Sequence, residues 1–256
     1  MVKHWALACG VSLASSEEID GADLVLALGG DGTMLGALRL GGPLGIPVLA
    51  ANLGRLGYLT EVDESGLPAA LDALRTGAFA VEERLALEAT WDGQSRVGYN
   101  DVVLSRTPGH GRAALGLRVD GQLLVRYASS GVIVATPMGS TAYSFAAGGP
   151  LVSPQTRAMI VTPDAPHGLF NRAVVLGDGE RLGVEVLASS GRVALEVDGQ
   201  LVDTVEPGWE MEITPNATPA RIVRLGPGGF AERARRKLGI TDPAALADFE
   251  LGRRGG

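Results

Sequence analysis

The 256-residue sequence predicts an α/β domain with a parallel sheet, followed by a β-rich domain. Up to about residue 80, short apolar strands alternate with helices, a pattern typical of a parallel sheet. Beyond it, Asp-Gly pairs at positions 92, 120, 178 and 198 separate apolar runs, which favours antiparallel hairpins. We therefore divide the chain into residues 1–85 and 86–256, with terminal helices that pack back toward the first domain.

Each predicted element of the first domain has its own signal. Residues 2–10 form an apolar run that we interpret as a buried strand containing Cys9. The strand at 24–28 leads through a glycine turn into a helix, which ends near residue 40 because glycines and Pro43 follow. A strand at 47–51 comes next, and leucines at helical spacing predict a helix over 64–76.

The second domain is predicted to be mostly strands from residues 82–91 onward. A short helix is expected over 140–147, and two further helices are expected over 231–238 and 243–251. A G-x-G-x-x-A pattern at 226–231 is interpreted as a connecting turn, because too few residues follow it for a dinucleotide-binding unit.

Composition excludes several functional classes. A net charge of −7 argues against a general nucleic-acid-binding protein. The single cysteine excludes an internal disulfide framework. No apolar run reaches the ~18 residues of a membrane helix, and the apolar piece at 5–8 is too short for a signal peptide. We therefore expect a soluble cytoplasmic protein without nucleic-acid or membrane partners.

The glycine turn at 29–33 reads Gly-Gly-Asp-Gly-Thr and lies between a predicted strand and a predicted helix. Glycines let backbone N–H groups approach a phosphate, and the start of a helix favours negative charge. A carboxylate in such a turn is useful only if it binds a metal or accepts a proton. Asp31 is therefore the first catalytic candidate, and the alternative is a residue that merely caps the helix.

Two further stretches have polar groups suited to a ligand. One spans residues 52–61 and includes Arg55, a candidate phosphate contact, and Tyr58. The other begins with a Thr-Pro turn at Thr136 and continues as a Gly-Ser-Thr-Ala-Tyr run that opens a helix. Its hydroxyl and N–H groups suit a phosphate or a nucleobase edge, and Tyr143 has a face for stacking. The alternative is a capped helix with a core tyrosine.

Taken in order, these blocks resemble the NAD kinases of bacterial type. The matching segments are 29–33, 52–61, 100–101, 136–150 and 198–200. The block that starts at Thr136 is highly specific. The glycine turn is less specific, because diacylglycerol-type lipid kinases and 6-phosphofructokinases share it.

The resemblance implies transfer of a phosphoryl group from ATP or polyphosphate, with Mg²⁺, to the adenosine 2′-hydroxyl of NAD, giving NADP. It implies that Asp31 is the base for that hydroxyl, although a metal-orienting role stays open. It also implies a homodimer or homotetramer, with the site in the cleft between the domains. The predicted nucleotide- and phosphate-binding residues are Gly29, Gly30, Gly32, Thr33, Arg55, Tyr58, Asn100, Asp101, Ser130, Thr136, Met138, Thr141, Ala142, Tyr143, His167 and Leu169, and no protein ligand to a metal is predicted.

The sequence departs from the family pattern in three places. Ser130 replaces the acid of a usual Gly-Asp-Gly, which approaches the nicotinamide-side nucleoside, and Met138 replaces a usual serine or threonine. The glycine turn also comes early, so the first strand and helix of the α/β domain are expected to be missing. These departures keep open a kinase for a different hydroxyl, such as that of a free nucleoside or small metabolite. A catalytically idle nucleotide-binding protein is the third reading, against which Asp31, Asn100 and Asp101 argue.

Overall fold

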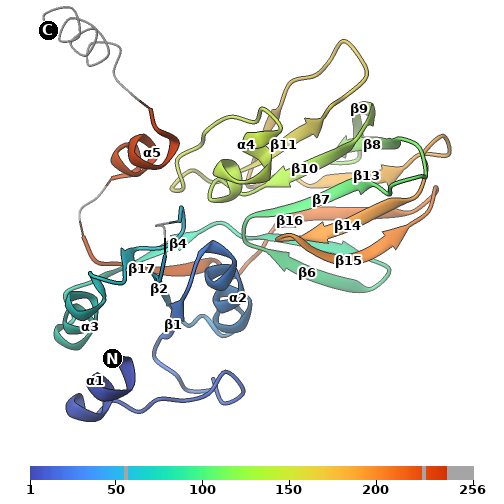
Figure 1. Cartoon of the computed structure of the whole chain (residues 1–256). Helices are drawn as coiled ribbons and strands as arrows, with labels where there is room; N and C mark the ends of the chain where they lie inside the picture. Colours follow the sequence, from blue (N-terminus) through green and yellow to red (C-terminus); the bar gives the residue numbers. More distant parts are fainter. Residues whose placement is uncertain (55–56, 227–228, 241–256) are drawn as a thin grey trace, which may run out of the picture.

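The computed structural model describes residues 1–54, 57–226 and 229–240. Its first sheet has the order β1 (Val25–Leu28), β2 (Val48–Asn52), β17 (Ala220–Arg224) and β4 (Ala80–Arg84), and β3 (Val62–Asp63) also pairs with β2. Strands β1, β3 and β17 run parallel to β2, and β4 is the antiparallel edge. The predicted parallel sheet is confirmed, and it includes a strand from near the end of the described chain (Figure 1).

Helices cover both faces of this sheet because β2 is apolar on both sides. Val48 and Ala50 pack with α2 (Asp31–Gly41), and Leu49 packs on the opposite face with α3 (Leu67–Thr76). The predicted helices are both confirmed, and the 3₁₀ turn η1 (Gly42–Leu44) follows α2 directly. The carboxyl ends of β1 and β2 therefore meet at the start of α2.

The prediction of a strand over residues 2–10 is wrong. Residues Val2–Cys9 form the helix α1, which ends at Gly10 in the left-handed conformation (φ 67°). The apolar run has helical spacing, since Val2 and Trp5 pack together against Leu67 and Leu71. Cys9 lies on the outer side of this helix and is exposed, so the expected core cysteine is also corrected.

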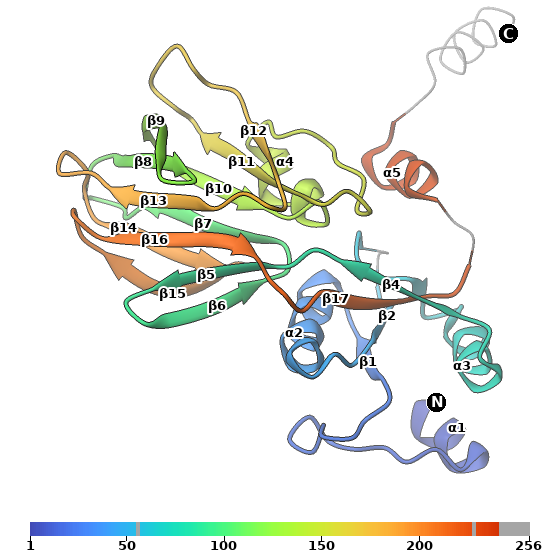
Figure 2. The same cartoon turned by 180° about the vertical axis from the view of Figure 1, so that it is seen from behind.

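The β-rich part is a sandwich of two six-stranded antiparallel sheets (Figure 2). One sheet has the order β12 (Val174–Gly177), β11 (Ala158–Asp164), β10 (Gly131–Ala135), β7 (Asp101–Arg106), β14 (Val193–Val197) and β15 (Gln200–Val205). The other has the order β6 (Gln94–Gly98), β5 (Leu87–Trp91), β16 (Glu210–Pro215), β13 (Leu182–Val186), β8 (Ala113–Val119) and β9 (Gln122–Ser129). Inward-facing side chains of both sheets form one apolar core.

Three of the four predicted Asp-Gly hairpins are confirmed. Asp92, Asp120 and Asp198 each have a positive φ of 45–48° and join paired strands. The turn at Asp178 is not a hairpin, because β12 and β13 belong to different sheets. This turn carries the chain from one sheet of the sandwich to the other. An Asp-Gly pair in the sequence does not distinguish such a connection from a hairpin.

Short helical segments cover the outer face of the β12–β15 sheet. The 3₁₀ turn η2 (Gly139–Thr141) and α4 (Tyr143–Ala146) occupy the predicted 140–147 helix, over a small cluster built on Ile133 and Ile160. Helix α5 (Phe230–Leu238) confirms the expected helix at 231–238, and the one expected at 243–251 lies outside the described residues.

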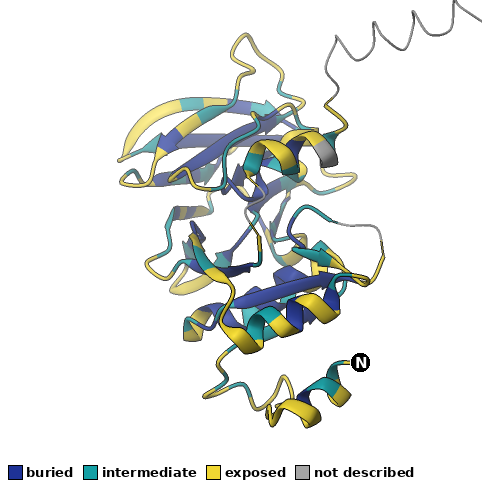
Figure 3. Ribbon diagram, turned by 90° about the vertical axis from the view of Figure 1, so that its left-hand side faces the viewer, coloured by how far each residue is buried: buried dark blue, intermediate teal, exposed yellow. Residues whose placement is uncertain are grey.

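The β4–β5 and β16–β17 connections join the sandwich to the first sheet (Figure 2). The proposed domain division at residue 85 stays a prediction. The first sheet also contains β17, which comes later in the chain than this boundary. Figure 3 shows that buried residues concentrate in the sheets, whereas the outer faces of the helices are exposed. No helix in the described part of the chain is long and apolar enough to span a membrane.

Candidate active site

The glycine turn lies where β1 and β2 end. The N–H of Gly29 donates to the carbonyl of Ala51 at 2.9 Å, which joins the two strand ends. Asp31 is the first residue of α2, and its half-buried carboxylate accepts two hydrogen bonds from a distant loop. The N–H of Tyr58 donates to Oδ2 at 2.8 Å and that of Leu59 donates to Oδ1 at 2.9 Å. Asp31 is therefore fixed in orientation before any ligand arrives.

Two glycines leave room for the side chains of Asp31 and Thr33. A Cβ on Gly57 would lie 2.1 Å from Oδ1 of Asp31, and a Cβ on Gly29 would lie 2.3 Å from Oγ1 of Thr33. Gly30 and Gly32 instead face open space. The N-terminus of α2 is therefore accessible to a ligand such as a phosphate. Arg55, in the same neighbourhood of the sequence, lies outside the described residues.

Tyr58 lies close to Asp31. Burial raises the pKa of the Tyr58 phenol, and the negative charge of Asp31 raises it further. The phenol therefore stays neutral at physiological pH.

A second set of polar residues lies at the start of β7. The buried carboxylate of Asp198 accepts N–H hydrogen bonds from Tyr99 at 3.0 Å, Asn100 at 2.7 Å and Asp101 at 3.3 Å. Nη1 of Arg39, near the end of α2, lies 3.6 Å from the same carboxylate. Asp198 therefore shapes the Asn100–Asp101 turn. The 198–200 block belongs to the sequence resemblance, but Asp198 is not among the predicted site residues.

Asp101 is buried, with 5% of its surface exposed. Burial raises its pKa to about 7, and the charges of Asp198 and Glu196 add to the effect. Burial also raises the pKa of Asp198, against the lowering effect of its backbone hydrogen bonds. Burial therefore favours the protonated forms of these two neighbouring carboxyl groups.

Thr136 joins the Asn100–Asp101 turn to the Thr-Pro block. Its hydroxyl donates to the carbonyl of Tyr99 at 2.7 Å and accepts from the N–H of Gly139 at 2.9 Å. Its own N–H donates to the carbonyl of Asn100 at 2.8 Å. A Cβ on Gly139 would lie 2.0 Å from that same carbonyl oxygen, so only glycine fits there.

The two halves of the predicted site meet at a hollow. Residues of the 58–59 segment, of the Thr-Pro block and of α5 line it: Tyr58, Leu59, Pro137, Met138, Thr141, Pro154, Arg224, Phe230, Arg233 and Ala234. The largely buried Met138 also belongs to the core under α2, together with Met34 and Leu59. It thus packs the two parts of the chain together as well as bordering the hollow.

Other predicted residues lie further along the sandwich. The N–H of Ser130 donates to the carbonyl of Asp164 at 2.9 Å. The Tyr143 hydroxyl donates to the carboxylate of Asp164 at 3.4 Å, so this strand end carries an acid that is not among the predicted site residues. His167 and Leu169 are exposed on the long β11–β12 connection (Figure 1), and the His167 N–H donates to Ala128 of β9 rather than to the Asn100–Asp101 turn.

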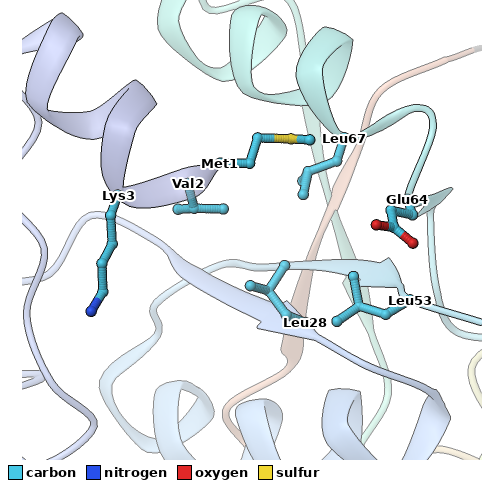
Figure 4. Close-up of a pocket in the computed structure, with 7 residues that line it drawn as sticks. All are labelled: Met1, Val2, Lys3, Leu28, Leu53, Glu64 and Leu67. Atoms are coloured by element: carbon cyan, nitrogen blue, oxygen red, sulfur yellow. The ribbon is translucent and has the colours of Figure 1, made fainter.

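A different, mainly apolar hollow lies beside α1 (Figure 4). Its lining residues are Met1, Val2, Lys3, Leu28, Leu53, Glu64 and Leu67. None of the predicted site residues lines it, and it offers no arrangement of polar groups for phosphoryl transfer.

Two family models match consecutive parts of the chain. The ATP-NAD kinase N-terminal domain matches residues 10–79, and the ATP-NAD kinase C-terminal domain matches residues 99–225. The chain belongs to the NAD kinase family. The resemblance predicted from the sequence is therefore confirmed, and the family makes the chain a phosphotransferase that acts on a hydroxyl group.

Individual relatives of the NAD kinase family agree with this assignment. The chain is 41% identical over 240 residues to an NAD kinase of Moorella thermoacetica, covering 92% of this chain and 77% of the relative. It is 38% identical over 277 residues to NAD kinase 1 of Streptomyces coelicolor, covering 92% and 76%.

Solved structures of the family share the two-part architecture. A crystal structure of yeast NADH kinase complexed with NADH has a TM-score of 0.83 and 28% identity, covering 91% of this chain and 70% of that one. An NAD kinase from Archaeoglobus fulgidus in complex with ATP has a TM-score of 0.75 and 28% identity, covering 93% and 92%. The predicted α/β domain followed by a β-rich domain is thus the family fold.

Proposed function

We propose that the chain transfers the γ-phosphoryl group of ATP to the 2′-hydroxyl of the adenosine ribose of NAD, giving NADP. Relatives named NAD kinase match over nine-tenths of the chain. One structural relative is described with ATP and another with NADH. The observation that carries the proposal is Asp31, held by the Tyr58 and Leu59 N–H groups at the open start of α2. Phosphorylation of a different hydroxyl is not favoured by these relatives.

In this proposal Asp31 takes the proton of the attacking hydroxyl. A ribose hydroxyl is a poor nucleophile, so a base within hydrogen-bond reach must remove its proton as the phosphorus is attacked. Each Asp31 oxygen accepts one backbone hydrogen bond and keeps a second acceptor site for the substrate. The two fixed N–H donors hold the carboxylate in place while the substrate binds.

The donor phosphates lie against the glycine turn. Gly30, Gly32 and Thr33 are exposed at the N-terminus of α2, where backbone N–H groups and the helix dipole favour anions. The phosphates also need neutralisation by a divalent cation. Mg²⁺ is commonly bound through one or two carboxylates together with substrate phosphates.

The residues present fit a cation that arrives with the nucleotide. Within residues 1–54, 57–226 and 229–240, no group of three or more His, Cys, Asp or Glu side chains could hold a metal. Asp31 is the carboxylate next to the phosphate-binding turn, and orienting Mg²⁺ bound by ATP would be its alternative role to that of the base. The cation would neutralise phosphate charge, and the chain would supply position and the base.

The acceptor nucleoside is assigned to the Asn100–Asp101 turn and the Thr-Pro block. Asp198 and Thr136 hold the turn in one conformation through backbone hydrogen bonds. Thr141, Ala142 and Tyr143 would line the pocket, and Ser130, His167 and Leu169 would contribute at its far end. The buried Asp101 would accept a hydrogen bond from a ribose hydroxyl, a common use of an acidic residue in dinucleotide sites.

We further propose that the chain works in the cytoplasm as a homodimer or homotetramer. Exposed apolar side chains on β9, on the β11–β12 connection and on β12 support an interface between copies: Leu123, Leu124, Leu169, Phe170 and Val175. Light scattering on the purified protein gives the mass of the assembly, and a monomer at micromolar concentration would contradict this proposal.

A substrate panel tests the proposed function. Purified protein is incubated with Mg²⁺ and either ATP or polyphosphate as donor, against NAD, NADH, adenosine and other nucleosides as acceptors. We expect formation of NADP from ATP and NAD, which stops in EDTA and returns with added Mg²⁺. Turnover of a free nucleoside without turnover of NAD or NADH would refute the proposal. The polyphosphate reactions decide whether ATP is the preferred donor.

A further inference from the structure

The segment that holds Asp31 ends in a buried ion pair. This segment spans residues 57–61, and Oε2 of its last residue, Glu61, lies 2.6 Å from Nη1 of Arg224 on β17. Each of the two side chains is only 10% exposed. The other Glu61 oxygen accepts the N–H of Leu225 at 3.0 Å. Both oxygens of Glu61 therefore attach the segment to the end of a strand about 160 residues later in the chain.

The other residues of the 57–61 segment also have little freedom. Leu59 lies in the core under α2, and Thr60 is 2% exposed. The Thr60 hydroxyl accepts the N–H of Gly57 at 3.1 Å, which closes residues 57–60 into a tight turn. The Glu61 N–H donates to the carbonyl of Ala50 at 2.8 Å. A shift of Glu61 would therefore be transmitted to the N–H groups of Tyr58 and Leu59.

Arg224 is itself fixed from the other side. Its Nε donates to Oε2 of Glu82 on β4 at 2.9 Å, and Arg84 pairs with the same carboxylate. Burial alone would raise the pKa of Glu82, but the hydrogen bond from Arg224 and the charges of Arg84 and Arg224 keep it below its ordinary value. Glu82 is therefore ionised, and Arg224 bridges two carboxylates, of which only Glu61 belongs to the segment that holds Asp31.

We propose that Glu61 and Arg224 are positioning residues for the phosphoryl-transfer base. Their buried ion pair fixes the 57–61 segment, so that the Tyr58 and Leu59 N–H groups hold the Asp31 carboxylate toward the acceptor hydroxyl. Neither residue touches the reacting atoms in this account. The expected effect on the rate of phosphoryl transfer rests on the proposed function. The expected effect on the mobility of residues 57–61 does not.

The chain offers a matched pair of variants for the test. Glu61→Gln keeps the size of the side chain but removes its charge from Arg224. Glu82→Gln removes a charge from the same Arg224 while leaving the 57–61 segment untouched. In the ligand-free protein, hydrogen exchange of the Tyr58 and Leu59 amides should be about tenfold faster in Glu61→Gln, a shift of about 1.4 kcal/mol in local opening. It should stay within about twofold of wild type in Glu82→Gln.

The kinetic consequence is a loss in kcat rather than in KM. A displacement of about 1 Å costs about 10²-fold, so a fractional displacement in Glu61→Gln should lower kcat by about ten- to a hundredfold. The KM for NAD should stay within about threefold, because the acceptor pocket is unchanged. Glu82→Gln should keep kcat within about threefold. Arg224→Met should resemble Glu61→Gln, and Arg224→Lys should recover part of the loss.

Specific results would overturn the proposal. Unchanged amide exchange in a folded Glu61→Gln protein would show that the ion pair does not fix the segment. Faster exchange with unchanged kcat would show that it does not position the base, and an equal loss of kcat in Glu82→Gln would assign the effect to general stability. If Glu61→Gln does not fold, Glu61→Asp provides the same comparison. If wild type forms no NADP, the proposed function fails, but amide exchange still decides the structural part.

Discussion

Gly57→Ala is the most direct local perturbation of the Asp31 carboxylate. A Cβ at position 57 would lie 2.1 Å from Oδ1, 2.6 Å from Cγ and 2.9 Å from Oδ2 of Asp31. Van der Waals contact requires more than 3 Å, so the carboxylate or the loop has to retreat by about 1 Å. Such a movement also lengthens the hydrogen bonds from Tyr58 and Leu59, now 2.8 and 2.9 Å.

The expected effect is a hundredfold loss of kcat. A misplacement of about 1 Å costs about 10²-fold in rate, which corresponds to about 2.7 kcal/mol of activation free energy. The assay is the initial rate of NADP formation at saturating NAD and ATP, with circular dichroism to establish that the fold is retained. The KM values should change by less than about threefold, since the methyl group faces Asp31 rather than the nucleoside turn.

Gly54→Ala is the matched control in the same loop. The added Cβ would have the Asn52 side-chain oxygen as its nearest neighbour, at 3.7 Å, which is an ordinary contact. We expect a kcat within about twofold of wild type. Equal rates in Gly57→Ala and Gly54→Ala would refute the reasoning, because the clash with Asp31 would then have no consequence for turnover.

Three further predictions concern the nucleoside side. Asp198→Asn weakens the hydrogen bonds that hold the Asn100–Asp101 turn and should raise the KM for NAD about tenfold while leaving the KM for ATP unchanged. The control is Asp203→Asn, whose side chain accepts a hydrogen bond from the N–H of the next residue, Thr204. Equal KM values for NAD in the two variants would contradict the assignment. Thr136→Val leaves the Tyr99 carbonyl and the Gly139 N–H without their hydroxyl partner. The free energy of unfolding, measured in urea, should therefore fall by about 2–4 kcal/mol, and Thr136→Ser should largely avoid this loss. Asp101 has a pKa raised to about 7 by burial, so its protonated form favours the folded state, and stability should fall as pH rises from about 4 to 7, by about 1.4 kcal/mol per unit. In Asp101→Asn this fall in stability with rising pH should vanish. The free energy of unfolding in urea, measured against pH, tests this, and the same pH dependence in wild type and variant would contradict the prediction.

The elements around the glycine turn could be predicted because local signals agree there. The apolar run at 24–28, the glycines and the helical spacing after Asp31 all indicate one strand–turn–helix unit, and the structure has it. Helix α1 could not be distinguished from a strand, since eight residues contain few helical repeats and its packed face consists of Val2, Trp5 and Ala6. The turn at Asp178 looked like its neighbours, because sheet membership depends on distant pairing.

Contacts between distant segments are what the sequence could not provide. Asp198 holds the N–H groups of residues almost one hundred positions earlier, and Arg224 holds Glu61 across most of the described chain. Each of these residues looks like an ordinary turn aspartate or surface charge in the sequence. Their importance follows only from burial and from the partners that the fold brings to them.

Turnover by Asp31→Asn is the measurement that tests the central claim most directly. The amide keeps the shape of the side chain but cannot take the proton of the acceptor hydroxyl. We predict that NADP formation at saturating NAD and ATP falls by about 10²- to 10⁴-fold, the range for loss of a general base. Binding of ATP and NAD, measured by calorimetry, should stay within about threefold. Turnover within tenfold of wild type, with binding retained, would contradict the account.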